Sequence, residues 1–412
     1  MPKAVTVVVS SLFPSKSAPF AGLFIRERMF RVARQMPIII VSPRPWSPFD
    51  WAIRLFRPAF RPTGAAFEQM AGIDVYRPRY LSFPGIGKRF DGGRMAASIR
   101  QLLANLSGKV QPTLIDAHFL YPDGYAASIV AQELNLPFSV TIRGSKDQRL
   151  IGTSREFGLR KALSRADAVI TVSALLRESV ALPMGASPEK VSVIGNGVDL
   201  AQFYPEDKVV ARGRLGLPVE SKVMVTVGTL IGLKGFHRVV ALMPALRRAW
   251  PNLHYLIVGG SVGHDGIEST LKALVAQHGL EDCVHFCGPQ QPAELRWYYS
   301  AADVFVLATE YEGWANVLLE AMACGTPVVT TRVGGNAQVV PNEALGLLCE
   351  FWNDDEFAAA IDVALNRQWD QSVLLEYARE HAWEAKIPEV VRTLNKVRRQ
   401  RVLNQGEPSP ES

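Results

Sequence analysis

The sequence predicts an α/β protein made of two doubly wound, Rossmann-like domains, each with a parallel sheet between helices. Short apolar runs rich in β-branched residues recur along the chain, and segments with helical periodicity separate them. Near residues 204–218 this pattern gives way to a stretch punctuated by Gly and Pro, which is typical of a linker. Together these observations predict two successive α/β domains.

The first half of the chain contains the less regular of the two patterns. Strands are expected at 5–10, 37–42, 113–118, 138–142, 168–172 and 191–195. These runs predict an N-terminal domain over 1–203, followed by the linker at 204–218.

The second half alternates more regularly. Strands are expected at 222–228, 254–260, 283–288, 303–308 and 326–331, and helices at 234–249, 267–278, 292–300 and 316–324. This pattern predicts a second domain over 219–378. A last helical segment within 379–403 has no strand after it, so we expect it to pack back on the first domain. We expect 404–412 to be disordered.

Ligands of open α/β sheets bind beyond the carboxyl ends of the strands. Two such domains facing each other would therefore enclose a cleft.

Composition sets the class of protein. The 412 residues are 48% hydrophobic and 20% charged, which is a globular composition. The sequence lacks the run of about eighteen apolar residues that a membrane span needs. Its Val-rich start suits a first strand better than a signal peptide. Four cysteines are too few for a disulfide scaffold, so we expect a cytoplasmic protein.

The net charge is +6 and the isoelectric point about 9.1, which suits nucleic acid, an anionic membrane or phosphorylated small molecules. No nucleic-acid recognition motif accompanies the charge. Residues 51–62 interleave Trp51, Phe56 and Phe60 with Arg54, Arg57 and Arg61. This segment is either interfacial or a helix or loop packed by its aromatic residues. The basic run at 396–401 indicates a solvated helix end.

One stretch, EYEGWANVLLEAMACGTPVV (310–329), carries the strongest chemical signal. Glu312 is expected in the loop at a strand's carboxyl end, and Glu320 about two turns into the following helix. The amides near Asn316 and Val317 favour an anion at the helix start. A diphosphate held there would have a sugar on one side and a ribose on the other, each within reach of a carboxylate. The alternative is an N-terminal-turn carboxylate and a half-exposed helical Glu.

A metal site is not expected. Cys283, His285 and Cys287 would share one strand face, but same-face neighbours lie too far apart to converge on one ion. These residues are expected to pack against a helix. The acidic run at 353–357 indicates a helix start with an Asn or Asp cap.

The 310–329 stretch resembles the Glu-x7-Glu signature of retaining glycosyltransferases of family 4. The resemblance continues in VGTLIGLKGF, VIGNGVDLAQF, DAHFLYPDG, FSVTIRGS and GGNAQVV, and covers nearly the whole chain in the expected order. It implies the GT-B fold, with two Rossmann-like domains facing across a cleft.

The resemblance also implies roles for individual residues. Glu312 would hold hydroxyls at the far side of the donor sugar, and Glu320 would bind the ribose. Lys234 would neutralise the diphosphate, and the alternative is a surface lysine in a first helical turn. Backbone donors to the phosphates and sugar would come from Gly313, Trp314, Ala315, Asn316 and Val317.

In the first domain, Gly22 matches the family's glycine loop, although a lone loop glycine is more often just a turn. His118 is expected near the acceptor or as a hydrogen-bonded structural residue, and Arg143 follows at the next strand end. The chain departs from the family at Thr229, where an arginine is usual, so one of two expected phosphate cations is missing. Arg143 is one candidate substitute.

The implied function is retaining transfer of a hexose from a UDP- or GDP-linked sugar to a hydroxyl acceptor, without a cofactor or metal. The HFLYPDG and RGS motifs resemble bacterial enzymes of exopolysaccharide, capsule or teichuronic-acid assembly. We therefore expect a polyprenyl-linked or other saccharide acceptor, with peripheral contact on the inner face of the membrane. The alternatives are a non-catalytic GT-B partner subunit, which Thr229 favours, and a GT-B-fold sugar-nucleotide epimerase or phosphorylase.

Overall fold

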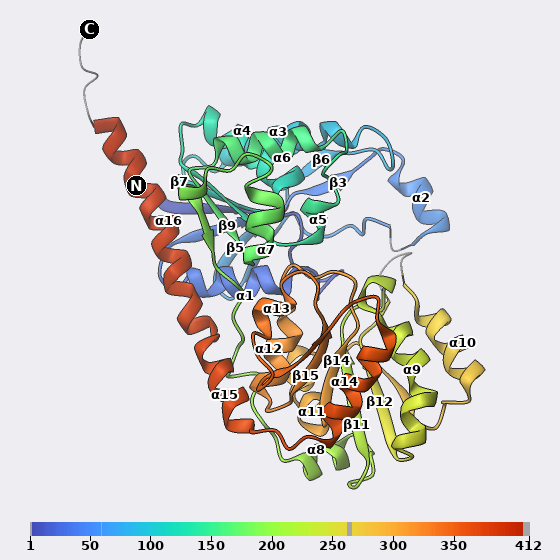
Figure 1. Cartoon of the computed structure of the whole chain (residues 1–412). Helices are drawn as coiled ribbons and strands as arrows, with labels where there is room; N and C mark the ends of the chain where they lie inside the picture. The colour runs from blue at the N-terminus through green and yellow to red at the C-terminus, as the bar shows by residue number, and fades with distance from the viewer. Residues whose placement is uncertain (1, 59, 262–265, 407–412) are drawn as a thin grey trace. The chain divides into compact units, whose positions relative to one another are not determined.

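The computed structural model describes residues 2–58, 60–261 and 266–406, without the side chains of Ser145 and 400–406. The chain divides into two compact units (Figure 1). Unit 1 comprises Met1–Gly195 and the chain from Lys386 onward, and unit 2 comprises Asn196–Ala385.

Unit 1 is built on one large sheet. Its strands lie in the order β10 (Val191–Val193), β9 (Ala168–Thr171), β8 (Phe138–Ile142), β7 (Val110–His118), β1 (Lys3–Val9), β2 (Ile38–Val41), β5 (Ile73–Tyr76) and β4 (Phe67–Met70). Neighbours are parallel except β4, which runs antiparallel to β5. A separate ribbon pairs β3 (Arg44–Trp46) with β6 (Arg79–Leu81). The central β1 and β7 mark the point where the strand order reverses.

The helices of unit 1 connect these strands. They are α1 (Leu23–Val32), α2 (Asp50–Phe56), α3 (Asp91–Asn105), α4 (Tyr125–Glu133), α5 (Ser145–Gln148), α6 (Glu156–Arg165) and α7 (Ala174–Leu176). Helices α3, α4 and α6 pack side by side (Figure 1). The long α16 (Trp383–Gly406) begins in unit 2, and its residues from Lys386 group with unit 1.

Unit 2 has a fully parallel sheet. Its order is β13 (Val284–Gly288), β12 (Leu253–Val258), β11 (Lys222–Val227), β14 (Val304–Leu307), β15 (Val328–Thr331) and β16 (Gly346–Cys349). The order reverses between β11 and β14, and such a switch point is where doubly wound folds bind ligands.

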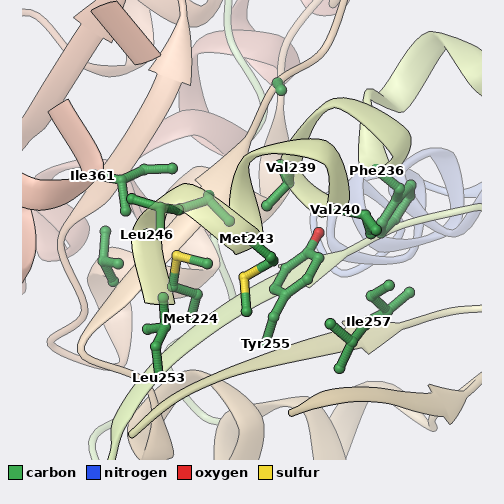
Figure 2. Packing of buried hydrophobic residues seen from close by; sticks show 14 of the residues in the cluster. Met224, Phe236, Val239, Val240, Met243, Leu246, Leu253, Tyr255, Ile257 and Ile361 are labelled. Carbon is green, nitrogen blue, oxygen red and sulfur yellow. The ribbon is translucent and has the colours of Figure 1, made fainter. Parts of the chain in front are cut away.

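Helices cover both faces of this sheet. One group contains α9 (Phe236–Ala249), α10 (Glu268–His278) and α14 (Asp354–Asn366), and the other contains α8 (Lys208–Arg214), α11 (Leu295–Ala301), α12 (Asn316–Ala323) and α15 (Gln371–Glu380). The short α13 (Asn336–Val339) follows β15. Figure 2 shows the first interface, where Val240 and Met243 of α9 pack on Met224 and Tyr255 of the sheet. Burying a side chain of this size stabilises the fold by about 1.5–3 kcal/mol.

The structure confirms the predicted α/β class, and the expected strands and helices are present in both halves. The prediction missed β3 to β6 and β16. At the edge of the sheet, β4 alternates exposed with half-buried positions, and its neighbour β5 alternates buried with half-buried positions. Both strands therefore lack the continuous apolar run of the central strands. The residues expected to form a linker, 204–218, include α8.

The end of the chain differs from the expected disordered tail. Helix α16 continues to Gly406, so residues 404–406 are helical, and 407–412 lie outside the described residues. Among the helices that the structure describes, none is long and apolar enough to cross a membrane.

Candidate active site

Three loops meet at the carboxyl edge of the unit 2 sheet, beside its switch point. They follow β11, β14 and β15 and cover residues 228–235, 308–315 and 332–335. The Glu310 amide donates a 2.9 Å hydrogen bond to the Leu233 carbonyl, and the Gly335 amide donates one of 2.9 Å to the Glu312 carbonyl. The middle loop is therefore tied to both of its neighbours.

Two glycines permit these close approaches. Gly235 and Gly334 have φ of 72° and 54°, a region that side chains rarely adopt. A Cβ at Gly235 would collide with the Ala308 carbonyl, and one at Gly334 would collide with the Glu312 carbonyl. Glycine at these positions lets the loops bring their side chains together.

Lys234 and Glu312 come from the first and second of these loops. Lys234 ends a 3-10 turn, Gly232–Lys234, and its Nζ makes an ion pair with Glu312 Oε1. The two side chains are 22% and 11% exposed. An anion that entered here would compete with Glu312 for the lysine ammonium.

Glu320 lies half-buried on α12, and its Oε2 accepts a 2.8 Å hydrogen bond from the Tyr299 hydroxyl of α11. Burial, aided by the nearby Glu320 charge, raises the pKa of Tyr299 well above its ordinary value. The phenol therefore remains a donor at neutral pH. It orients one oxygen of the predicted ribose-binding carboxylate.

The start of α12 presents backbone donors. The helix begins at Asn316, and its first turn contains no acidic residue, so its first amides are donors without a carboxylate from that turn. Asn316 Oδ1 accepts a 3.0 Å hydrogen bond from Asn196 Nδ2. The Trp314 Nε1 is buried with no hydrogen-bond partner among the described residues. In this stretch Gly313, Trp314 and Ala315 are buried, whereas Asn316 and Val317 are half-buried.

Thr229 is exposed in the loop after β11, where its carbonyl accepts a 2.8 Å hydrogen bond from the Ile231 amide. It therefore occupies the loop that carries Lys234 but supplies no charge. Its predicted place at the donor stays a prediction, as do the ligand contacts of the other residues in unit 2.

In unit 1, Gly22 ends the loop that follows β1, residues 10–22, and directly precedes α1. Its φ is 67°, and a Cβ there would collide with the Leu12 carbonyl. The glycine thus allows the loop to fold back against the helix start. A contact with phosphate or sugar stays a prediction.

His118 ends β7 and is fully buried. Its Nδ1 accepts a 2.9 Å hydrogen bond from Arg143 Nε. A neutral ring would then carry its proton on Nε2, which lies 3.5 Å from Asp116 Oδ2 and has no hydrogen-bond partner among the described residues. Burial, with the charges of Arg143 and Arg28, lowers the pKa of His118 well below its ordinary value. His118 and Asp116 therefore do not form an ion pair.

A buried charge cluster surrounds this histidine. Asp116 accepts a 2.7 Å hydrogen bond from the Ser139 hydroxyl. Burial raises the pKa of Asp116 to about 6, against the opposing effects of that hydrogen bond and of Arg143 and Arg28. The Arg143 guanidinium also lies 5.2 Å from the centre of the Phe24 ring, just after Gly22. The structure thus brings His118, Arg143 and the start of α1 together.

A second buried acid follows in the same region. Asp147 Oδ1 accepts a 2.7 Å hydrogen bond from the Leu120 amide, while its Oδ2 has no hydrogen-bond partner in the described part of the chain. Burial raises the pKa of Asp147 to about 7. The neighbouring Lys146 is exposed and lies 3.8 Å from Asp123 Oδ2.

Within the described residues, no group of three or more His, Cys, Asp or Glu side chains is arranged to hold a metal ion. His285 pairs with another histidine: its Nε2 lies 2.9 Å from His254 Nδ1 on the adjacent strand. Cys283 is buried and hydrogen-bonds the Leu280 carbonyl.

Sequence reasoning missed Tyr299, Arg28 and Asp116. The place of Asp116 could have been predicted from the sequence, because Asp116 stands two residues before His118 and so faces the same side of β7. Tyr299 and Arg28 find their partners far along the chain, and no local pattern marks them.

Two family models match the chain. Residues 17–202 match Glycosyltransferase Family 4, and residues 207–381 match Glycosyl transferases group 1.

Named relatives and solved structures agree with these matches. The chain is 30% identical to the putative teichuronic acid biosynthesis glycosyltransferase TuaC of Bacillus subtilis, over 79% of this chain and 80% of the relative. It is 32% identical to a D-inositol 3-phosphate glycosyltransferase of Segniliparus rotundus, over 72% of this chain and 68% of that relative.

Among solved structures, sucrose-phosphate synthase of Thermosynechococcus elongatus superposes with a TM-score of 0.74 at 24% identity, covering 98% of this chain and 100% of that one. The structure of Anabaena Alr3699/HepE in complex with UDP-glucose superposes with a TM-score of 0.65 at 18% identity, covering 98% of this chain and 99% of that one. These similarities identify the fold as GT-B. The chain belongs to the family 4 glycosyltransferases.

Proposed function

We propose that this protein is a retaining glycosyltransferase that moves a hexose from a UDP- or GDP-linked sugar to a hydroxyl acceptor. The ion pair between Lys234 and Glu312 at the switch point of unit 2 carries the proposal. It sets a cation and a carboxylate beside the donor-rich start of α12, with Glu320 further along the same helix. The HepE structure that resembles this chain was solved with UDP-glucose, which supports the donor class.

Each residue then has a distinct task. The diphosphate displaces Glu312 from Lys234 and takes the ammonium and the first amides of α12 as its partners. The freed Glu312 accepts hydrogen bonds from sugar hydroxyls. Glu320, oriented by Tyr299, accepts them from the ribose.

The chemical step breaks the bond from the anomeric carbon to the phosphate oxygen and forms one to the acceptor oxygen on the same face. Positive charge develops on the sugar ring and negative charge on the leaving diphosphate. Lys234 and the helix amides stabilise that negative charge. The acceptor proton passes to the departing phosphate. The proposed step requires no metal or cofactor.

For the acceptor we propose a lipid-linked saccharide used in bacterial surface-polysaccharide synthesis, met at the inner face of the membrane. The name of the TuaC relative supports the polymer class. Helix α2 supports the location, because Trp51, Leu55 and Phe56 are exposed beside arginines.

Vesicle flotation tests this location. The protein should float with vesicles rich in anionic lipid at low salt, and a W51Q/F56Q variant should float less. An exposed arginine away from α2 supplies the control, R34Q. Failure of the unmodified protein to float would reject the membrane contact.

Transfer itself is tested with labelled UDP- and GDP-sugars and bacterial lipid extract. The label should move into an organic-soluble product, and the anomeric configuration of that product should match the donor. Lys234→Ala should lower transfer about a hundredfold or more, whereas the exposed Lys272→Ala should leave it unchanged. Inverted configuration would reject retention. No transfer from any donor, in folded protein, would favour the non-catalytic partner that Thr229 suggests.

A further inference from the structure

Five arginines line a pocket of about 90 Å³ in unit 1, beside α2: Arg44, Arg54, Arg61, Arg77 and Arg79. A neighbouring pocket of about 210 Å³ shares Arg44, Arg61 and Arg77. It continues to Ser11, Ser15 and Ser17 in the loop between β1 and Gly22. The arginine pocket therefore leads to the carboxyl end of β1, at the switch point of unit 1.

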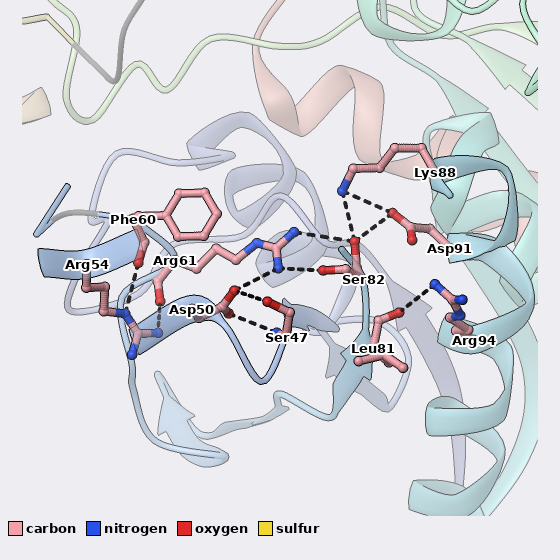
Figure 3. A network of polar contacts seen from close by, with 10 residues as sticks. All are labelled: Ser47, Asp50, Arg54, Phe60, Arg61, Leu81, Ser82, Lys88, Asp91 and Arg94. Carbon is pink, nitrogen blue, oxygen red and sulfur yellow. Dashed lines mark hydrogen bonds and ion pairs between the residues drawn. The ribbon is translucent and has the colours of Figure 1, made fainter. Parts of the chain in front are cut away.

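Internal contacts hold three of these arginines. Arg77 pairs with Glu68 and donates a 2.6 Å hydrogen bond to the Pro14 carbonyl. Arg61 contacts Asp50 at 3.3 Å and donates a 2.6 Å hydrogen bond to the Ser82 carbonyl (Figure 3).

Within the described residues, Arg54 donates hydrogen bonds only to backbone carbonyls, those of Phe60 at 3.1 Å and Arg61 at 2.6 Å (Figure 3). These contacts hold Phe60 and Arg61 against α2. The charges of the pocket wall are thereby fixed in place.

Arg44 is held differently. Its guanidinium lies against Gly64, where a Cβ would collide with Nη1. That Nη1 is buried and has no hydrogen-bond partner among the described residues. Burial and the charge of Arg77 lower the pKa of Arg44. A buried donor left unpaired is costly, and Arg44 also lines the pocket, where an anion would offer its guanidinium a partner.

The charges around the pocket do not balance. Glu68 and Asp50 pair with Arg77 and Arg61, but Arg44, Arg54 and Arg79 form no ion pair with any described carboxylate. The planar guanidinium group of arginine suits phosphate because it can donate two parallel hydrogen bonds to the phosphate oxygens. The surplus cations therefore match a phosphate-bearing ligand.

An apolar surface adjoins the pocket on the same helix. Asp50 and Arg54 line the pocket, and the next stripe of α2 carries Trp51 and Leu55, which are 66% and 71% exposed. Phe56 is 88% exposed. Large apolar groups beside phosphate-binding cations suit an amphiphile with a phosphorylated head and an apolar chain.

We propose that the arginine pocket binds the phosphate or diphosphate group of the acceptor, and that the acceptor's apolar chain lies along the exposed stripe of α2. This assignment rests on the proposed transferase function, and it specifies the acceptor as a phosphorylated lipid. The acceptor's hydroxyl end would extend through the neighbouring pocket toward the β1 loop.

Direct binding to the full-length protein tests the assignment. Calorimetry would compare farnesyl diphosphate, which has both head and chain, with inorganic pyrophosphate and farnesol. Arg44→Gln and Arg79→Gln should each weaken farnesyl diphosphate binding about tenfold or more, since each removes a charge-assisted contact. Leu55→Gln should weaken farnesyl diphosphate binding but not pyrophosphate binding.

Arg34→Gln, which removes the same charge from an exposed site just after α1, is the matched control and should leave both affinities unchanged. Equal affinity of all the variants for farnesyl diphosphate would overturn the assignment. Equal affinity of the unmodified protein for pyrophosphate and farnesyl diphosphate would overturn the place given to the apolar chain.

Nucleotide-sugar affinity measured on the same proteins separates this inference from the proposed function. Loss of farnesyl diphosphate binding in Arg44→Gln, with nucleotide-sugar binding retained, would support both. If no nucleotide sugar binds but farnesyl diphosphate binding depends on Arg44, the transferase proposal fails and the phosphate pocket stands.

Discussion

The Tyr299 hydroxyl of α11 donates a 2.8 Å hydrogen bond to Glu320 Oε2 of α12. Tyr299 is fully buried, so its ring position is fixed by the packing of the two helices. The tyrosine therefore positions one oxygen of the half-buried Glu320 carboxylate. This makes Tyr299 a positioning residue for the proposed ribose contact.

Tyr299→Phe should weaken nucleotide-sugar binding about fivefold to tenfold, because loss of a hydrogen bond to a charged group removes part of Glu320's orientation. Turnover at saturating donor should change little. Tyr298→Phe, on the same helix, is the control. Equal donor affinities in the two variants would show that Glu320 needs no such support.

The regular secondary structure was predictable wherever a single strand or helix carried its own signal. The α9 segment was expected at 234–249 and begins at Phe236, because Lys234 ends a separate turn and Gly235 adopts a left-handed conformation. The β4 and β5 hairpin escaped prediction because its residues alternate at a sheet edge. Its existence depends on the neighbouring β2, which local periodicity does not reveal.

The candidate site was likewise predictable where a local motif marked its residues, and not where its contacts join distant segments. Lys234 and Glu312 were assigned to one site through the resemblance to family 4 glycosyltransferases, and the loops that carry them follow parallel strands whose carboxyl ends share one edge of the sheet. Their direct ion pair, and the contact of Glu320 with Tyr299, depend on packing between distant segments. The arginine pocket was seen only in part, through Arg54 and Arg61, because Arg44 and Arg77 come from other elements.

Lys234→Ala should lower turnover about a hundredfold or more, with a smaller change in donor affinity, because the lysine acts chiefly on charge that develops on the leaving group. Lys234→Arg should recover part of the rate. Steady-state kcat and KM separate the two effects. A variant with unchanged kcat would exclude the lysine from the chemical step.

Gly334→Ala should destabilise the protein by about 2 kcal/mol more than Gly279→Ala. Both glycines have positive φ, so both variants bear the backbone strain. Only at Gly334 would the new methyl collide with the Glu312 carbonyl, whereas the space around Gly279 is open. Urea unfolding measures the difference, and equal losses would contradict the tight loop contact.

The paired His254 and His285 rings should make the protein less stable in acid. Burial, together with the neighbouring His285 and Arg247 charges, lowers the pKa of His254, and burial lowers the pKa of His285. The folded protein therefore binds fewer protons at this pair than the unfolded chain. Its stability is fully present above pH 6.5, the ordinary value, and is lost as the pH falls below it.

His285→Gln should reduce this acid-dependent loss by an amount on the order of 0.5 kcal/mol, since both rings are half-exposed and water screens their charges. The measurement is the free energy of unfolding across this pH range. The exposed His278→Gln should leave the pH dependence unchanged. If the free energy of unfolding varied with pH equally in the unmodified protein and in both variants, the pKa values of the pair would not change on folding.

The most direct test of the donor site is equilibrium binding of UDP-, GDP- and ADP-sugars to the purified protein and to Glu320→Ala, with the exposed Glu310→Ala as control. We predict selective binding of a UDP- or GDP-sugar, weakened at least about tenfold in Glu320→Ala and unchanged in Glu310→Ala. Binding of no nucleotide sugar by well-folded protein, or equal affinity in both variants, would contradict the assignment of this site to the donor.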